Sequence, residues 1–61
     1  MVRDEDILRT AQGLLRNHGG KAAMECALMV DRWEAKQDYE AAEVWRRVLN
    51  AIREMERETK H

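Results

Sequence analysis

The chain has 61 residues, a net charge of −1, 38% charged residues, no proline and one cysteine. This length allows one domain over residues 1–61, and a chain of about 60 residues buries only roughly 60% of the surface that it exposes when unfolded. A single cysteine excludes an intramolecular disulfide, and the sequence contains no zinc-type set of Cys and His residues. Stability therefore has to come from regular helix packing or from association with another subunit.

Charge is spread evenly, because no third of the chain departs from neutrality by more than two charges. Bulk electrostatics therefore does not favour nucleic acid or an anionic membrane as a partner. The first residues, MVRDEDIL, are acidic where a secretory signal peptide is basic, and no window approaches the ~18 apolar residues of a membrane span. With one cysteine, expected to stay reduced, the predicted location is the cytoplasm.

Residues 4–18 are predicted to form the first helix. Asp4 is the expected N-cap, and Gly13 falls on the solvent side. Apolar residues recur at helical spacing on the other side, followed by a histidine. The members of this stripe are Ile7, Leu8, Ala11, Leu14, Leu15 and His18.

Residues 21–36 are predicted to form a second helix that is apolar on two sides. One stripe contains mostly small residues: Ala23, Cys26, Ala27, Val30 and Trp33. A second patch, containing Met24, Leu28 and Ala35, lies on nearly the opposite side, with Met29 on its flank. A helix of this kind is either central in its domain or contacts something outside it, and in so small a unit we expect the second.

Residues 39–58 are predicted to form a third helix, with Asp38 as its N-cap. Its main stripe contains Ala41, Ala42, Trp45, Val48, Leu49 and Ile52. Val44, Ala51 and Met55 widen this stripe to about half of the helix circumference. This apolar surface is larger than a core of three helices requires.

Short connections at Gly19-Gly20 and near Gln37-Asp38 join these helices. Connections of this length place consecutive helices as antiparallel neighbours. The predicted fold is all-α: a compact antiparallel three-helix unit, with helices at about 4–18, 21–36 and 39–58, that dimerises.

The stretch LLRNHGGKAAMEC contains the one segment that resembles a phosphate-binding loop. The spacing of its glycines is wrong for such a loop, no strand precedes it, and Ala22 replaces the required Ser or Thr. Gly19 and Gly20 are therefore interpreted as a helix end and a hinge. An anion bound near His18 and Lys21 remains a minor alternative.

No catalytic, metal or cofactor site is predicted. His18 has no partner that would complete a catalytic relay, and Cys26 lies on the small-residue stripe, where burial raises the pKa of a thiol. Glu58 and His61 have the spacing of one half of a di-iron motif, but the sequence has no second half. Trp33 and Trp45 are expected in the core, with an interface role as the alternative.

A basic stripe on the third predicted helix suggests another class of function. Its members are Arg46, Asn50, Arg53 and Arg57. This spacing would let a helix contact phosphates or base edges along a groove. Glu43, Glu54 and Glu58 lie beside the arginines and compete for them. Nucleic-acid binding is thus kept as the alternative function.

Two resemblances extend these arguments. The segment WEAKQDYEAAEVWRRVLNAI resembles the helical hairpin of a tetratricopeptide unit at Asp38, Tyr39 and Ala42, although Gln37 replaces the turn glycine. Most of the chain resembles a family of short bacterial three-helix proteins, a domain of unknown function with no assigned activity. The residues that match its pattern are Leu14, Leu15, His18, Gly19, Ala22, Ala23, Ala27, Asp31, Asp38, Ala42, Trp45, Arg47, Val48, Leu49, Ala51 and Ile52.

The sequence therefore predicts a small, non-catalytic, cytoplasmic protein-interaction module whose first partner is a second copy of itself. Another protein is a further possible partner, and no membrane is involved. Met-rich apolar patches suit adaptable interfaces. The predicted interface residues are Met24, Leu28, Met29, Val44, Ala51 and Met55.

Overall fold

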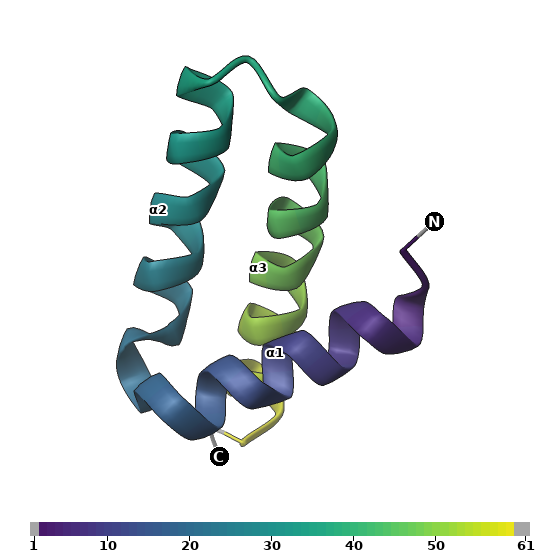
Figure 1. The fold of residues 1–61 in the computed structure, drawn as a ribbon. Helices are drawn as coiled ribbons and strands as arrows, with labels where there is room; N and C mark the ends of the chain where they lie inside the picture. The colour runs from purple at the N-terminus through teal and green to yellow at the C-terminus, as the bar shows by residue number, and fades with distance from the viewer. Residues whose placement is uncertain (1, 60–61) are drawn as a thin grey trace.

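The computed structural model describes residues 2–59, and all regular structure within that range is helical. Helix α1 spans Asp4–His18, a 3-10 turn, η1, spans Gly19–Lys21, α2 spans Ala22–Ala35, and α3 spans Tyr39–Thr59. Helices α2 and α3 run antiparallel, side by side, as a hairpin (Figure 1). The all-α fold is confirmed, and each helix bound lies within one residue of its predicted place.

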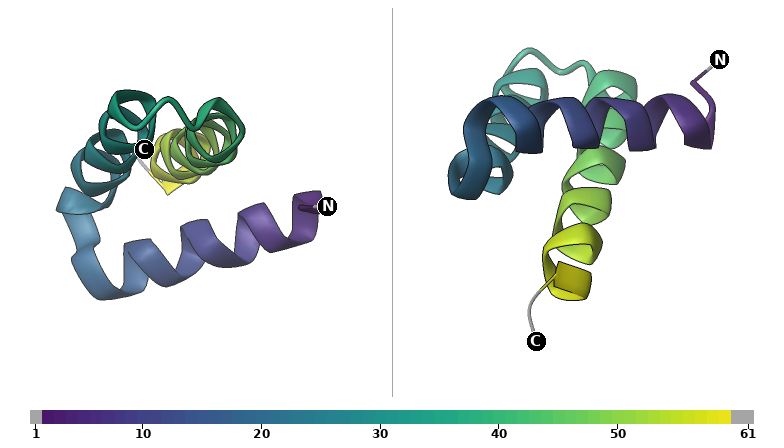
Figure 2. Two further views of the ribbon diagram at one scale, coloured as in Figure 1. Left: turned by 45° about the horizontal axis from the view of Figure 1, so that its top comes forward. Right: turned by 90° about the horizontal axis from the view of Figure 1, so that it is seen from below.

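Helix α1 crosses this hairpin instead of lying alongside it. Figure 2 shows α1 passing across α3, with its C-terminal end joined to α2. The glycine segment forms a 3-10 turn, so α1, η1 and α2 make one bent helical path from Asp4 to Ala35. This bend leaves α1 crossing the hairpin (Figure 2), so the antiparallel placement predicted for α1 is wrong.

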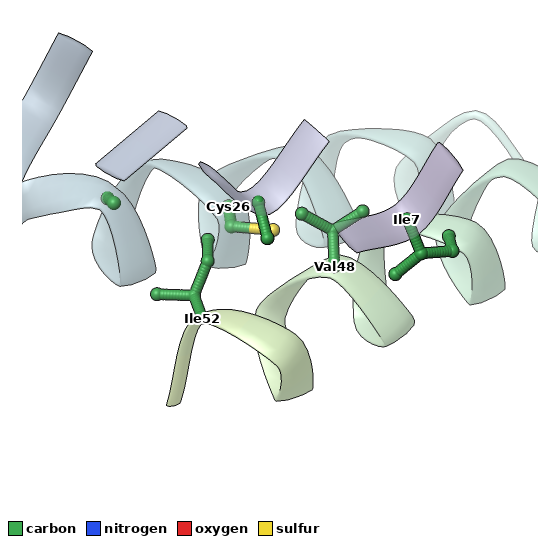
Figure 3. Close-up of a cluster of buried hydrophobic side chains, with 6 residues drawn as sticks. Ile7, Cys26, Val48 and Ile52 are labelled. Carbon is green, nitrogen blue, oxygen red and sulfur yellow. The ribbon is translucent and has the colours of Figure 1, made fainter. Parts of the chain in front are cut away.

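The core consists of small and medium-sized side chains. Figure 3 shows Ile7 of α1, Cys26 of α2, and Val48 and Ile52 of α3 gathered in one cluster. Within residues 2–59 the buried apolar residues are Ile7, Ala11, Ala22, Cys26, Val30, Ala42, Val48 and Ile52. Alanines let the helix axes approach closely, but they bury little area, and buried area sets the hydrophobic stabilisation.

Helix α3 uses its wide apolar stripe to contact both other helices. Val44, Ala51 and Met55 are half-buried and pack against the core cluster. Part of the apolar surface that the sequence analysis took as exceeding the needs of the core is therefore covered within the chain. A stripe covering half of a helix is what α3 needs, because α2 runs along one side of it and α1 crosses another.

Side chains at two helix starts account for where those helices begin. The Asp38 Oδ1 accepts a hydrogen bond of 3.1 Å from the Ala41 N–H, which confirms Asp38 as the N-cap of α3. Asp4, by contrast, is the first residue of α1 and not its N-cap, and Arg3 precedes the helix. The Arg3 N–H donates to the Asp6 carboxylate at 3.4 Å, as in one half of a capping box.

Helix α2 ends in a Schellman motif. The Asp38 N–H donates to the Trp33 carbonyl, and the Gln37 N–H donates to the Glu34 carbonyl, each at 2.9 Å. This motif requires a left-handed residue, and Gln37 has a φ of 63°. A side chain in that region costs about 1–2 kcal/mol, a cost that glycine avoids.

Replacing Gln37 with glycine should therefore stabilise the protein. We expect Gln37→Gly to raise the free energy of unfolding by about 1 kcal/mol, measured by urea denaturation. Gln12→Gly is the matched control, because Gln12 is exposed in the interior of α1, where the same substitution should cost about 1 kcal/mol. Equal destabilisation by both substitutions would contradict the left-handed role of Gln37.

Candidate functional site

The side of α2 that faces away from the core carries two large apolar side chains. Met24 is 55% exposed and Leu28 is 54% exposed, one helical turn apart. Ala22, Cys26 and Val30 of the same helix are buried on the opposite side. We call the exposed side the α2 outer face, and its members are Met24, Leu28, Asp31 and Ala35, all of which are exposed.

Two opposite charges border the α2 outer face on one flank. Glu25 lies one turn before Leu28, and Arg32 lies one turn after it. Neither side chain forms an ion pair with another residue in the range 2–59. The two residues are separated by about two helical turns.

The other predicted interface residues lie in more sheltered places. Met29 is half-buried and lines a shallow hollow of about 180 Å³ with Leu14, His18, Glu25, Cys26 and Trp45. Val44 lines a neighbouring hollow of about 440 Å³ between α1 and α3. Trp45 lines both hollows and is half-buried, so it lies at the edge of the core and not fully inside it as predicted. Of the six residues, the structure leaves only Met24 and Leu28 as an exposed pair.

Cys26 is a packing residue. Its side chain is fully buried, and its thiol donates a hydrogen bond to the Trp45 carbonyl at 3.1 Å, which links α2 to α3. Burial raises the pKa of the Cys26 thiol above its ordinary value. The predicted burial of Cys26 is confirmed, and since only the thiolate is a good nucleophile, this burial disfavours reaction of the thiol.

The glycine segment serves as the bend between α1 and α2. His18, Gly19, Gly20 and Lys21 are exposed, and Gly19 has a positive φ of 56°. The Gly19 N–H donates to the Leu15 carbonyl, and the Gly19 carbonyl accepts from the Ala22 N–H. These hydrogen bonds close the end of α1 and the start of α2, which fits the hinge interpretation.

Two of the three arginines in the α3 stripe, Arg46 and Arg57, form ion pairs with carboxylates. Arg46 pairs with Glu34 and also approaches Glu43 at 3.6 Å. Arg57 pairs with Glu54 at 3.4 Å. Arg46, Asn50 and Arg53 line one hollow between α2 and α3, but Asp31 and Glu34 line it too. The local potential is therefore mixed, which disfavours phosphate binding.

The other residues singled out in the sequence add no chemistry. The Trp33 indole N–H is buried without an acceptor among the described residues, and the Lys36 ammonium lies 5.0 Å from the centre of that ring. Glu58 is exposed, and His61 lies outside the described residues. Within residues 2–59 no group of three or more His, Cys, Asp or Glu side chains is placed to hold a metal ion. In the same range no helix has the length and apolar character needed to cross a bilayer.

Comparison with known proteins identifies no relative. No protein-family model, no curated protein and no solved structure matches this chain. The resemblances to the bacterial three-helix family and to the tetratricopeptide hairpin therefore stay predictions. The function is therefore inferred from the surface residues of this chain.

The buried thiol gives a test of the packing around the candidate site. A disulfide reagent should modify Cys26 much more slowly in the native protein than in the protein unfolded by urea, by at least tenfold. The raised pKa leaves less thiolate at any given pH, so the native reaction should also need a higher pH than the unfolded one. The rates are followed by absorbance of the released thiolate.

An exposed thiol serves as the control for that measurement. In Arg9→Cys/Cys26→Ala the only thiol is moved to an exposed position of α1, and it should react quickly in the folded state. Equal rates for native and unfolded wild-type protein would contradict the burial of Cys26.

Proposed function

We propose that this chain is a small, non-catalytic helical module that acts by binding protein surfaces, and that its first partner is a second copy of itself. The observation that carries the proposal is the pair Met24 and Leu28. Both side chains are more than half exposed, one turn apart, opposite the buried side of α2. Covering exposed apolar area of this kind with another apolar surface removes it from water and lowers the free energy of the system.

The small core supports association with a second copy. Eight residues in the range 2–59 form the buried apolar set, and three of them are alanines. A domain of about this size is marginally stable alone, and burying further apolar surface adds roughly 25 cal/mol for each Å² removed from water. Pairing of α2 with its copy would extend the core across a symmetric interface, the commonest form of association between soluble subunits.

A binding role is favoured over an enzymatic one by the state of the reactive side chains. Cys26 is buried as a neutral thiol, and His18 is exposed on a turn. The hollow that contains both residues is shallow and has a mainly apolar lining. Within residues 2–59 His18 forms no hydrogen bond to Cys26 or Glu25, and the Cys26 thiol donates to the Trp45 carbonyl instead, so neither residue has a hydrogen-bonded partner that would activate a nucleophile. We also propose a cytoplasmic location, where a single cysteine stays reduced.

The alternative function, nucleic-acid binding through the α3 stripe, ranks second. Arg46 would first have to give up its contacts with Glu34 and Glu43, and Arg57 its contact with Glu54. Duplex binding that weakens steeply with salt would support this alternative, because each phosphate contact releases counterions.

Charged substitutions on the α2 outer face test self-association. Sedimentation equilibrium at two micromolar concentrations should give a dimer for the wild type and a monomer for Met24→Lys/Leu28→Lys, because an interface cannot bury two unpaired ammonium groups. The thermal midpoint of the wild type should rise with protein concentration, and that of the variant should not.

Leu8→Lys is the matched control for these substitutions. Leu8 is 49% exposed on α1, away from the α2 outer face, so this variant should stay dimeric. A monomeric wild type at both concentrations would reject the proposed self-association. Equal dissociation of the Leu8 variant would reject the assignment to α2.

A further inference from the structure

The flank of the α2 outer face is self-complementary in charge. Glu25 and Arg32 are seven residues apart, which is about two helical turns, so they lie on the same flank. Glu25 is half-buried, Arg32 is exposed, and neither has an ion-pair partner among the described residues. A surface that binds its own copy needs this property, because a two-fold axis brings the same patch together with itself.

The position of these charges along α2 selects one orientation of the second copy. The midpoint of Ala22–Ala35 falls between Leu28 and Met29. When two such helices pack antiparallel about that midpoint, they overlap over their whole length, and Glu25 of each copy lies opposite Arg32 of the other. In a parallel pair related by a two-fold axis, this flank faces the opposite flank of the copy, so Glu25 and Arg32 of the two chains lie on different sides of the interface and form no pair.

We infer that a second copy of this chain binds the α2 outer face in antiparallel orientation, with a two-fold axis at the middle of α2. This inference rests on the proposed self-association and adds the arrangement of the partner. Met24 and Leu28 supply the apolar centre, and two symmetry-related Glu25–Arg32 pairs fix the register. Charge pairs beside an apolar centre set partner choice and orientation in paired helices.

The remaining charge on the α2 outer face is compatible with this arrangement. Asp31 is exposed on the α2 outer face, on the side of Met24 that points away from Glu25 and Arg32. In the antiparallel pair the two copies of Asp31 are separated along the axis by more than one helical turn, so they do not lie opposite each other.

Charge reversal tests the orientation. We expect Glu25→Arg and Arg32→Glu each to weaken the dimer by about tenfold in Kd, because symmetry makes each substitution create two like-charge contacts. The double variant Glu25→Arg/Arg32→Glu should return the Kd to within about threefold of the wild type, because both pairs re-form with reversed sign. The Kd values are measured by sedimentation at low salt, and the effect of the single substitutions should shrink at high salt.

A charge reversal on another helix is the control for the change in net charge. Arg9 is exposed on α1 and forms no ion pair within residues 2–59, so Arg9→Glu should leave the Kd unchanged. Recovery in the double variant also shows that the single substitutions do not act by unfolding the chain.

The outcomes separate this inference from the proposed function. If Met24→Lys/Leu28→Lys dissociates the dimer but the two charge reversals have no effect, the antiparallel register is wrong and self-association stands. The same conclusion follows if the loss of binding free energy in the double variant equals the sum of the losses in the two single variants. If the wild type itself is a monomer, both proposals fall.

Discussion

The crossing of α1 over α3 is the interaction on which the rest of the structure depends. It brings Ile7 and Ala11 onto Val48 and Ile52, and it completes a cluster to which α2 contributes Ala22 and Cys26. Without this crossing, the apolar stripe of α3 would be covered on one side only. The crossing also decides which surface of the molecule stays uncovered, because α1 lies against α3 and leaves the far side of α2 in water.

This arrangement links stability to association. Most core positions are occupied by alanine, valine or cysteine, side chains that allow close helix packing but bury little area each. The exposed Met24 and Leu28 offer apolar area of the same kind on the outside. A second copy laid along α2 would therefore act as the part of the core that one chain is too short to supply.

The helices could be predicted because their local signals agree. The chain has no proline to interrupt them, apolar residues recur at helical spacing, and Asp38 sits where an N-cap belongs. The direction of α1 could not be predicted, because it depends on the 3-10 geometry of Gly19–Lys21, for which a glycine pair allows many conformations. The left-handed conformation of Gln37 was also not predicted, since the Schellman hydrogen bonds that end α2 impose a conformation that a residue with a side chain disfavours.

The candidate site was partly visible in the sequence. Periodicity placed Met24 and Leu28 opposite the small-residue stripe, and this separation holds in the structure. Val44, Ala51 and Met55 are half-buried against the core cluster, a packing that the sequence did not predict, because the number of apolar residues on one helix does not reveal how many neighbours cover it. The pairing of Glu25 with Arg32 could not be predicted from the sequence, because it depends on the midpoint of α2, and that midpoint is known only once the structure gives the helix bounds.

The central claim is that the α2 outer face is covered by the same face of another copy. The most direct measurement is an isotope-filtered nuclear Overhauser experiment on a mixture of labelled and unlabelled protein, which detects only contacts between different molecules. The account predicts signals between the Leu28 methyl groups of one copy and side chains of α2 in the other. Signals from a different surface, or none at a concentration where sedimentation detects a dimer, would contradict it.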